Sequence, residues 1–121
     1  MIWQDVYTTL HNYSGVSSLV SNRIYPSIVN QDPTYPCISH LQVSEVGITE
    51  LSGASDLINP NWQIDAWDTS YSGAKALMAQ IRSAMDAATL FKSILITEID
   101  IYEQELNIHR VMAEFSLWAK A

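Results

Sequence analysis

Residues 62–85, WQIDAWDTSYSGAKALMAQIRSAM, hold the two patterns that decide the fold of this chain. Apolar and polar residues alternate over 62–68, which is the period of a strand with one buried face. Over about 70–88 the apolar residues instead recur every three or four positions, which predicts an amphipathic helix. Because such faces are stabilised by burial, we expect the helix to pack on the sheet that contains this strand.

The same two periods recur on both sides of this stretch. The predicted elements are a helix at 2–13, strands at 37–46, 62–68, 94–102 and 108–119, and a helix at about 70–88. Val16, Leu19 and Val20 suggest one or two further helical turns. The turn at 103–107 is short, so the last two strands should form an antiparallel hairpin. The order predicts one α+β domain over residues 1–121, with a mainly antiparallel four-stranded sheet and two helices packed on one face.

Alternation also assigns strand residues to faces of the sheet. The expected core includes Ile64, Leu77, Ile81, Phe115 and Leu117. We place Cys37, Leu41 and Val43 on the core side of their strand. Thr97, Ile99 and Ile101 share one face of the third strand, and Glu98 and Asp100 lie on its polar face.

Residues 47–61, GITELSGASDLINPN, predict a long loop, because glycine, serine, asparagine and proline interrupt both periods. Loops of about fifteen residues are uncommon in compact domains and are usually functional or mobile. Its apolar members are Ile48, Leu51, Leu57 and Ile58. We expect this loop to bind a partner through them and to become ordered on binding.

The composition limits the classes of function. The chain has 121 residues, of which 48% are apolar, and a net charge of −7. Its six basic residues are scattered, so no basic stripe is available to bind nucleic acid. Neither a signal peptide nor a membrane-spanning segment is evident. The single cysteine, Cys37, excludes an intrachain disulfide and a multi-cysteine metal site.

The residues that could carry chemistry show no catalytic or metal-binding spacing. His11, His40 and His109 belong to three separate elements. Cys37 has the pattern of a packed core residue rather than of a nucleophile. The carboxylate cluster consists of Glu98, Asp100, Glu103 and Glu105. A solvated strand face and a turn explain this cluster, so we expect no catalytic residue, no cofactor and no metal.

Large side chains gather on the face of the predicted sheet that the helices leave open. The candidate interface residues are Trp67, Tyr102, Met112 and Trp118, with Asp65, Glu98, Asp100, Arg110 and Glu114 as a polar rim. Aromatic residues and methionine are enriched at protein interfaces, and contiguous exposed aromatics usually mark contact surfaces. Cross-strand pairing on an ordinary exposed face is the alternative explanation. We favour a subunit interface.

Several short segments share their order and spacing with a known family. They are the N-terminal helix, Leu19–Val20 through Arg23–Pro26, Pro36–His40, Leu51–Gly53, Gln63–Asp68 with its alanine-rich helix, and His109–Val111 through Phe115–Trp118. In combination, these segments resemble the tail-completion or tail-terminator proteins of long-tailed bacteriophages, which also occur as prophage minor tail proteins.

The resemblance implies a non-enzymatic structural virion protein. Proteins of this family form a ring, expected here to be a hexamer, on the head-proximal end of the tail tube. The ring ends tube polymerisation and offers a docking surface for the head. The implied partners are further copies of the chain, the major tail tube protein and a head-completion or connector protein. DNA would pass through the channel without specific binding, no membrane is involved, and the location is the virion tail, assembled in the host cytoplasm.

Two other functions stay open at this point. One is a head-closure or other connector-ring protein of the same particle, which would have the same composition and the same ring assembly. The other is a small-molecule-binding enzyme domain, which needs a pocket with convergent polar groups. The sequence shows no such set of groups.

Overall fold

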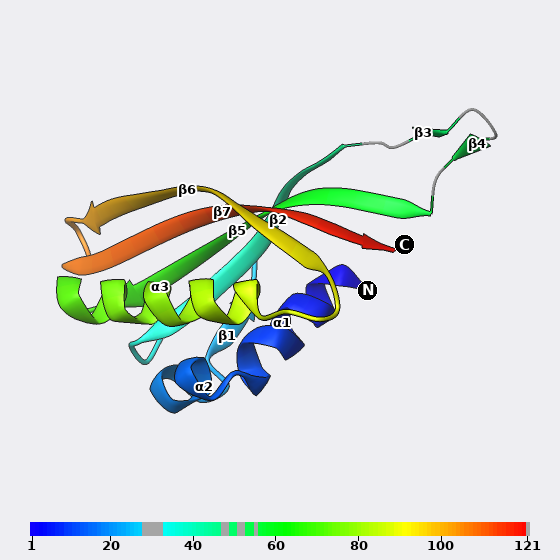
Figure 1. The fold of residues 1–121 in the computed structure, drawn as a ribbon. Helices are drawn as coiled ribbons and strands as arrows, with labels where there is room; N and C mark the ends of the chain where they lie inside the picture. The colour runs from blue at the N-terminus through cyan, green and yellow to red at the C-terminus, as the bar shows by residue number, and fades with distance from the viewer. Residues whose placement is uncertain (28–32, 47–48, 51–52, 55, 121) are drawn as a thin grey trace.

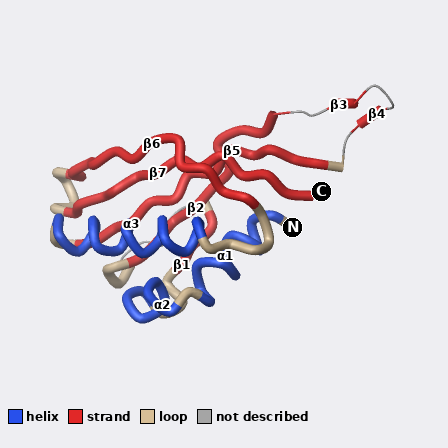
Figure 2. Tube along the Cα trace, viewed as in Figure 1, coloured by secondary structure: helices blue, strands red, loops and turns tan. Residues whose placement is uncertain are grey.

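The computed structural model describes residues 1–27, 33–46, 49–50, 53–54 and 56–120. Three helices lie on one side of a twisted sheet in this part of the chain (Figures 1 and 2). The helices are α1 (Ile2–Asn12), α2 (Ser14–Val20) and α3 (Tyr71–Asp86). The strands are β1 (Ile24–Pro26), β2 (Cys37–Val46), β3 (Thr49–Glu50), β4 (Gly53–Ala54), β5 (Leu57–Asp68), β6 (Lys92–Glu103) and β7 (Ile108–Lys120).

The main sheet has five strands in the order β1-β2-β5-β7-β6. The short strand β1 runs parallel to β2, and the other neighbours are antiparallel. The α+β class and the terminal hairpin are confirmed, whereas the prediction of four antiparallel strands and two helices was wrong. The sequence pattern missed β1 because three residues ending in a proline are too few to show alternation. The further helical turns suggested by Val16, Leu19 and Val20 are present as α2, although the predicted number of packed helices left them out.

The core lies between the helices and the sheet face that they cover. All five residues expected there, Ile64, Leu77, Ile81, Phe115 and Leu117, are buried. The N-terminal helix adds Val6 and Leu10 from its apolar stripe. α3 begins where the Ser70 hydroxyl accepts a hydrogen bond from the Gly73 amide, as is typical of a residue that caps a helix N-terminus. The alternation of β5 and the period of α3 therefore fix how the two elements face each other.

The face assignment of β2 was reversed. Ile38 lies opposite Ala66 and His40 opposite Ile64, which places this pair toward the helices. Cys37 lies opposite Trp67 on the other face, although it is still buried. The error came from His40, a polar residue that the core accepts because the Trp62 indole N–H donates to its Nδ1 at 3.0 Å.

In β6, the side of the sheet that a residue faces does not follow its polarity. Glu98 lies opposite Ala113 and Asp100 opposite Val111, both of which belong to the core face. Ile99 lies opposite Met112 and points away from the helices. The physical reason is that cations of α3 reach across to the two carboxylates, so acidic residues occupy the helix side of this strand.

Residues predicted as the loop 47–61 belong in part to strands. β2 continues to Val46, which pairs with Asn59, and β5 begins at Leu57. The strands β2 and β5 form a projection that carries the two-residue strands β3 and β4 at its far end (Figure 1). Leu57 and Ile58 pair with Lys120 and Ala119 of β7, so they are not in a loop. Ile48 and Leu51 lie outside the described residues.

Candidate functional site: the helix-free face and the outer edge of the sheet

We call the side of the sheet away from α1, α2 and α3 the helix-free face. It is formed by Asp65 and Trp67 of β5, Ile94, Thr97, Ile99 and Ile101 of β6, and Arg110, Met112, Glu114, Ser116 and Trp118 of β7. Strict alternation in β7 produces this face, because Val111, Ala113, Phe115 and Leu117 all point into the core. The helix-free face is therefore a mixed surface with apolar residues concentrated along β6 and at both ends.

Three of the four predicted interface residues share the helix-free face. Trp67 and Met112 lie near one end, and Trp118 lies six residues further along β7, about 20 Å away at the rise of a strand. Trp118 keeps 40% of its surface exposed. The three are therefore brought to one face but not into one cluster.

Tyr102 is on the other side of the sheet, contrary to the prediction. It lies opposite His109, with a ring distance of 4.8 Å, and its hydroxyl donates to Asn107 Oδ1 at 3.0 Å. The Tyr71 ring at the start of α3 also contacts His109. Tyr102 thus belongs to a small aromatic group beside the start of α3.

Two exposed residues of the helix-free face were missed as candidates. Ile94 and Ile99 are about half exposed and point outward from β6. Apolar residues occupy both sides of this strand, so alternation alone could not separate them. Counting the antiparallel register back from the turn at 103–107 would have placed Ile99 beside Met112.

One end of the helix-free face is a packed polar cluster. The Trp67 indole N–H donates to Ser39 Oγ at 3.0 Å, and the Arg110 guanidinium lies 5.0 Å from the centre of the Trp67 ring. Arg110 also reaches Asp65 at 3.6 Å and Glu103 at 3.3 Å. Asp65 is buried rather than part of an exposed rim, and burial raises the pKa of its carboxyl. Most polar groups at this end of the face therefore have partners, whereas the buried Arg110 Nε has none among the described residues.

Cys37 lies beside this cluster, opposite Trp67. Burial raises the pKa of its thiol to about 11, so the thiol is protonated at neutral pH. A protonated, buried thiol packs as a small apolar residue.

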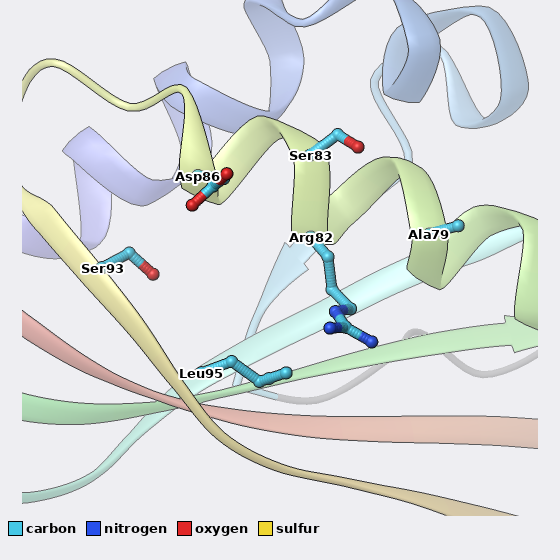
Figure 3. A pocket seen from close by; sticks show the side chains of 6 residues that line it. All are labelled: Ala79, Arg82, Ser83, Asp86, Ser93 and Leu95. Carbon is cyan, nitrogen blue, oxygen red and sulfur yellow. The ribbon is translucent and has the colours of Figure 1, made fainter.

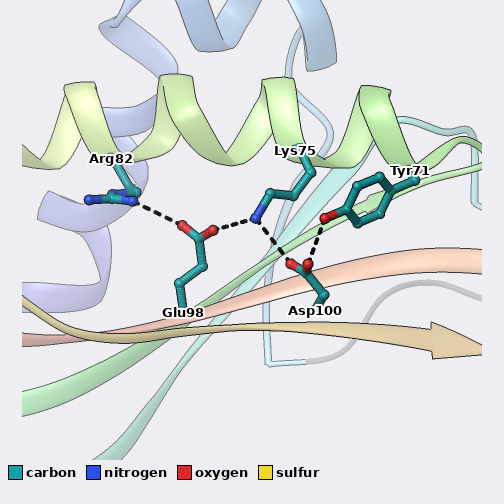
Figure 4. A network of polar contacts seen from close by, with 5 residues as sticks. All are labelled: Tyr71, Lys75, Arg82, Glu98 and Asp100. Carbon is teal, nitrogen blue, oxygen red and sulfur yellow. Dashed lines mark hydrogen bonds and ion pairs between the residues drawn. The ribbon is translucent and has the colours of Figure 1, made fainter.

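Glu98 and Asp100 take part in a network that joins β6 to α3 (Figure 4). Lys75 Nζ donates to Glu98 Oε2 at 2.7 Å and to Asp100 Oδ1 at 3.1 Å. The Tyr71 hydroxyl donates to Asp100 Oδ2 at 2.7 Å, and Arg82 reaches Glu98 at 3.3 Å. Hydrogen bonds from Tyr71 and Lys75 lower the pKa of Asp100, and bonds to Glu98 and Asp100 raise the pKa of Lys75. These carboxylates are held as paired anions, which suits a structural clamp.

A hollow of about 410 Å³ lies between the second half of α3 and the start of β6 (Figure 3). Its lining consists of Ala79, Arg82, Ser83, Asp86, Ser93 and Leu95. Arg82 is already bonded to Glu98, and the lining residues include neither a histidine nor a cysteine. Its serines, Ser83 and Ser93, share the hollow with the Asp86 carboxylate, and no hydrogen bond joins them in the described structure.

The histidines do not converge. Within the described ranges, no group of three or more His, Cys, Asp or Glu side chains is placed to hold a metal ion. His40 is enclosed in the core, where burial lowers its pKa to about 4. None of the helices in the described part has the length and apolar character needed to cross a membrane.

Comparison with protein families identifies the family of this chain. The family model of the tail completion protein gp17 matches residues 4–120. The chain belongs to this tail completion protein family. It is therefore a structural tail protein of a phage-like virion. Comparison with curated protein sequences found no match.

A solved structure agrees with the fold of this tail completion protein. A chain from the virion of a native gene transfer agent particle superposes with a TM-score of 0.76. The alignment has 16% sequence identity and covers 96% of this chain and 92% of that chain. At this identity, the likeness supports the whole three-helix, five-stranded arrangement rather than any single residue.

Proposed function

We propose that this tail completion protein caps the head-proximal end of the tail tube as a ring, expected to contain six copies. The ring would end tube polymerisation and present the docking surface for a head-completion or connector protein. The observation that carries the proposal is the helix-free face, where Trp118 and Ile94 are exposed toward one end and Ile99 toward the other. Exposed apolar residues gathered on one face of a structural protein are typical of a contact with another protein.

The charge of the chain fits a channel for DNA. Each copy carries −7, so six copies carry six times that charge. Like charges weaken adhesion between an acidic wall and the phosphate backbone, so DNA can pass without specific binding. The partners are thus proteins: further copies, the tail tube protein and the head protein, which meet in the host cytoplasm during assembly.

The projection of β2 and β5 is our candidate for contact with the tube or head. Leu57 and Ile58 remain proposed contact residues, now at the base of the projection beside the end of β7. Ile48 and Leu51 stay in the proposal from their sequence pattern alone. A segment far from the helices and core can engage a partner without disturbing the fold.

Changing Trp118 to a charged residue tests the ring proposal. We expect Trp118→Glu to keep its melting temperature near wild type but to give tails of uncontrolled length that do not join heads. Trp3→Glu is a matched control, because Trp3 is 41% exposed but lies on α1, on the helix side of the sheet. Electron microscopy of particles made with each variant is the measurement.

The outcomes separate the possible roles. Normal, joined tails with Trp118→Glu would remove Trp118 from the interface. Tails of normal length that fail to join heads would favour a connector role over tube termination. A collapsed melting curve would place Trp118 in the core instead.

A further inference from the structure

The main sheet has an open edge on each side. β6 is the last strand in the order β1-β2-β5-β7-β6, and in the described chain it pairs only with β7. On the opposite side, β1 pairs with β2 only at Ile38–His40. The outer backbone edge of Leu41–Val46 is therefore also without a strand partner among the described residues. Figure 2 shows β6 and β2 at opposite sides of the sheet.

The β6 edge is long and free of proline, and its inward charges, Glu98 and Asp100, are neutralised by cations of α3. Edges are usually protected by short length, prolines, lysines or inward charges, since an open edge offers unpaired N–H and C=O groups to another strand. β6 has twelve residues without proline, and Lys92 is its sole basic residue. Ile94, Ile96 and Ile99 are each about half exposed. A bulge between Leu95 and Thr97 interrupts the strand but leaves 97–103 continuous.

The two edges differ in charge. The charges of β6 are balanced, because its three carboxylates and Asp65 stand against Lys92, Lys75, Arg82 and Arg110 in and around the strand. Residues 41–61, which include the open edge of β2, contain Glu45, Glu50 and Asp56 and no basic residue. Two β2 edges would therefore repel each other, whereas the balanced β6 edge of another copy can approach the acidic edge without like-charge repulsion.

We infer that the open edge of β6 in one copy pairs, strand to strand, with the open edge of Leu41–Val46 in a second copy. The inference rests on the proposed function, in that the pairing would form the contact around the ring. The pairing uses two different edges, so each copy can pair its β6 edge with one neighbour and its Leu41–Val46 edge with another. Such head-to-tail contacts generate closed rings when the rotation per copy closes. Main-chain hydrogen bonds supply the attraction, as in other cases of strand addition.

Disulfide trapping between two different variants tests this pairing. In a Cys37→Ala background, one protein carries Val43→Cys and a second, mass-tagged protein carries Ile99→Cys. Mixed under mild oxidation, they should give the mixed disulfide in preference to either self-linked product. A disulfide needs Cα atoms about 4.4–6.8 Å apart, so the result depends on how the two strands are aligned. Glu45→Cys and Ile96→Cys are therefore combined in the same way to sample other alignments.

Several results would overturn the pairing. Self-linked Ile99→Cys as the main product would show a two-fold contact between two β6 strands. A ring of six copies by native mass spectrometry, but with no link in any combination, would reject the pairing and leave the ring itself intact. A chain that stays monomeric to about 1 mM and forms no link would also reject it. Links that form while tails still grow to uncontrolled length would instead reject the capping function alone.

A substitution at the edge gives an independent measurement. Ile99→Lys places a charge on the outward side of β6 and should weaken self-association at least about tenfold in sedimentation experiments. Leu106→Lys is the matched control, because Leu106 is also exposed but lies in the turn after β6. Equal association of the two variants would contradict the pairing, provided that both melt like wild type.

Discussion

His40 shows how a single residue departs from the polarity rule. It is a histidine in the core, 1% exposed, held by the Trp62 indole and stacked against that ring. The bond to Nδ1 fixes the neutral tautomer with its proton on Nε2, and Nε2 has no hydrogen-bond partner among the described residues. The charged form would thus be buried without compensation, which makes this residue sensitive to acid.

We expect His40 to make the folded protein less stable as the pH falls. Burial lowers its pKa from 6.5 to about 4, so the unfolded chain takes up the proton first as pH falls. The contribution of neutral His40 to the free energy of unfolding is fully present above about pH 6.5 and is lost as the pH falls toward 4. The shift in pKa corresponds to a loss of about 3 kcal/mol. Urea unfolding of wild type and His40→Gln at pH 7 and pH 4.5 measures it.

The comparison between two proteins is needed because other groups also titrate. Burial raises the pKa of Asp65, so the contribution of Asp65 to stability falls as the pH rises, which is opposite in sign to that of His40. His40→Gln keeps an oxygen that can accept the Trp62 bond but removes the titration. The same loss of stability in both proteins would assign the acid sensitivity to other residues.

The core position of Leu77 gives a second test at this scale. Leu77→Ala should lower the free energy of unfolding by about 2–5 kcal/mol, because it removes a fully enclosed side chain from α3. Leu106→Ala makes the same chemical change at a residue that is 61% exposed, and should change stability by less than about 0.5 kcal/mol. Chemical denaturation of the two variants is the measurement, and similar values for both would contradict the face assignment of α3.

At the scale of elements, the α3–β6 network explains why an edge strand with mixed polarity stays in the sheet. We expect Lys75→Met to lower the melting temperature by no more than a few degrees at low salt, because exposed ion pairs contribute little and are screened. The difference from wild type should shrink in about 1 M salt. Lys92→Met is the control, since Lys92 forms no ion pair with the described residues. A deficit of Lys75→Met that persists at high salt would point to lost packing rather than charge.

Periodic elements were predictable from the sequence, and short or ambiguous ones were not. β2, β5, α3 and β7 each carry a long run with one clear period, so their existence and the core residues Ile64 and Leu77 followed from it. α2 was indicated only by the spacing of Val16, Leu19 and Val20, and β1, with three residues, is too short to show a pattern of its own. β6 carries apolar residues on both sides, such as Ile94 and Leu95, so only its register with β7 decides that Ile99 faces outward. Tyr102 was misplaced for the same reason.

At the scale of the whole molecule, the projection of β2 and β5 extends away from the helices and the core. The strands β3 and β4 pair only with each other within the described part of the chain, at the far end of that projection. The core residues lie instead between the helices and the main sheet. The distal part can therefore be altered without removing core contacts.

We expect a chain in which residues 47–56 are replaced by a six-residue Gly-Ser linker to fold normally. Its melting temperature should stay within a few degrees of wild type, because loop length changes stability only slowly. Its ability to cap tails should be lost, if the projection makes the proposed contact. Calorimetry and electron microscopy measure the two effects. A scrambled 47–56 segment of equal length serves as control for loop length, and normal capping by the linker variant would exclude the distal segment as a contact.

The central place of β5 has a consequence for how the chain is made. Leu57 pairs with Lys120, so β5 cannot complete its hydrogen bonds until Lys120 has left the ribosome. Non-local strand pairing of this kind is slow, whereas the β6–β7 hairpin is local and can form early. β6 joins the sheet only through β7, so its outer edge takes its place in the sheet at the final step of folding. On the proposed pairing, chains that lack β7 would also lack the edge that another copy recognises, so only finished subunits would enter assembly.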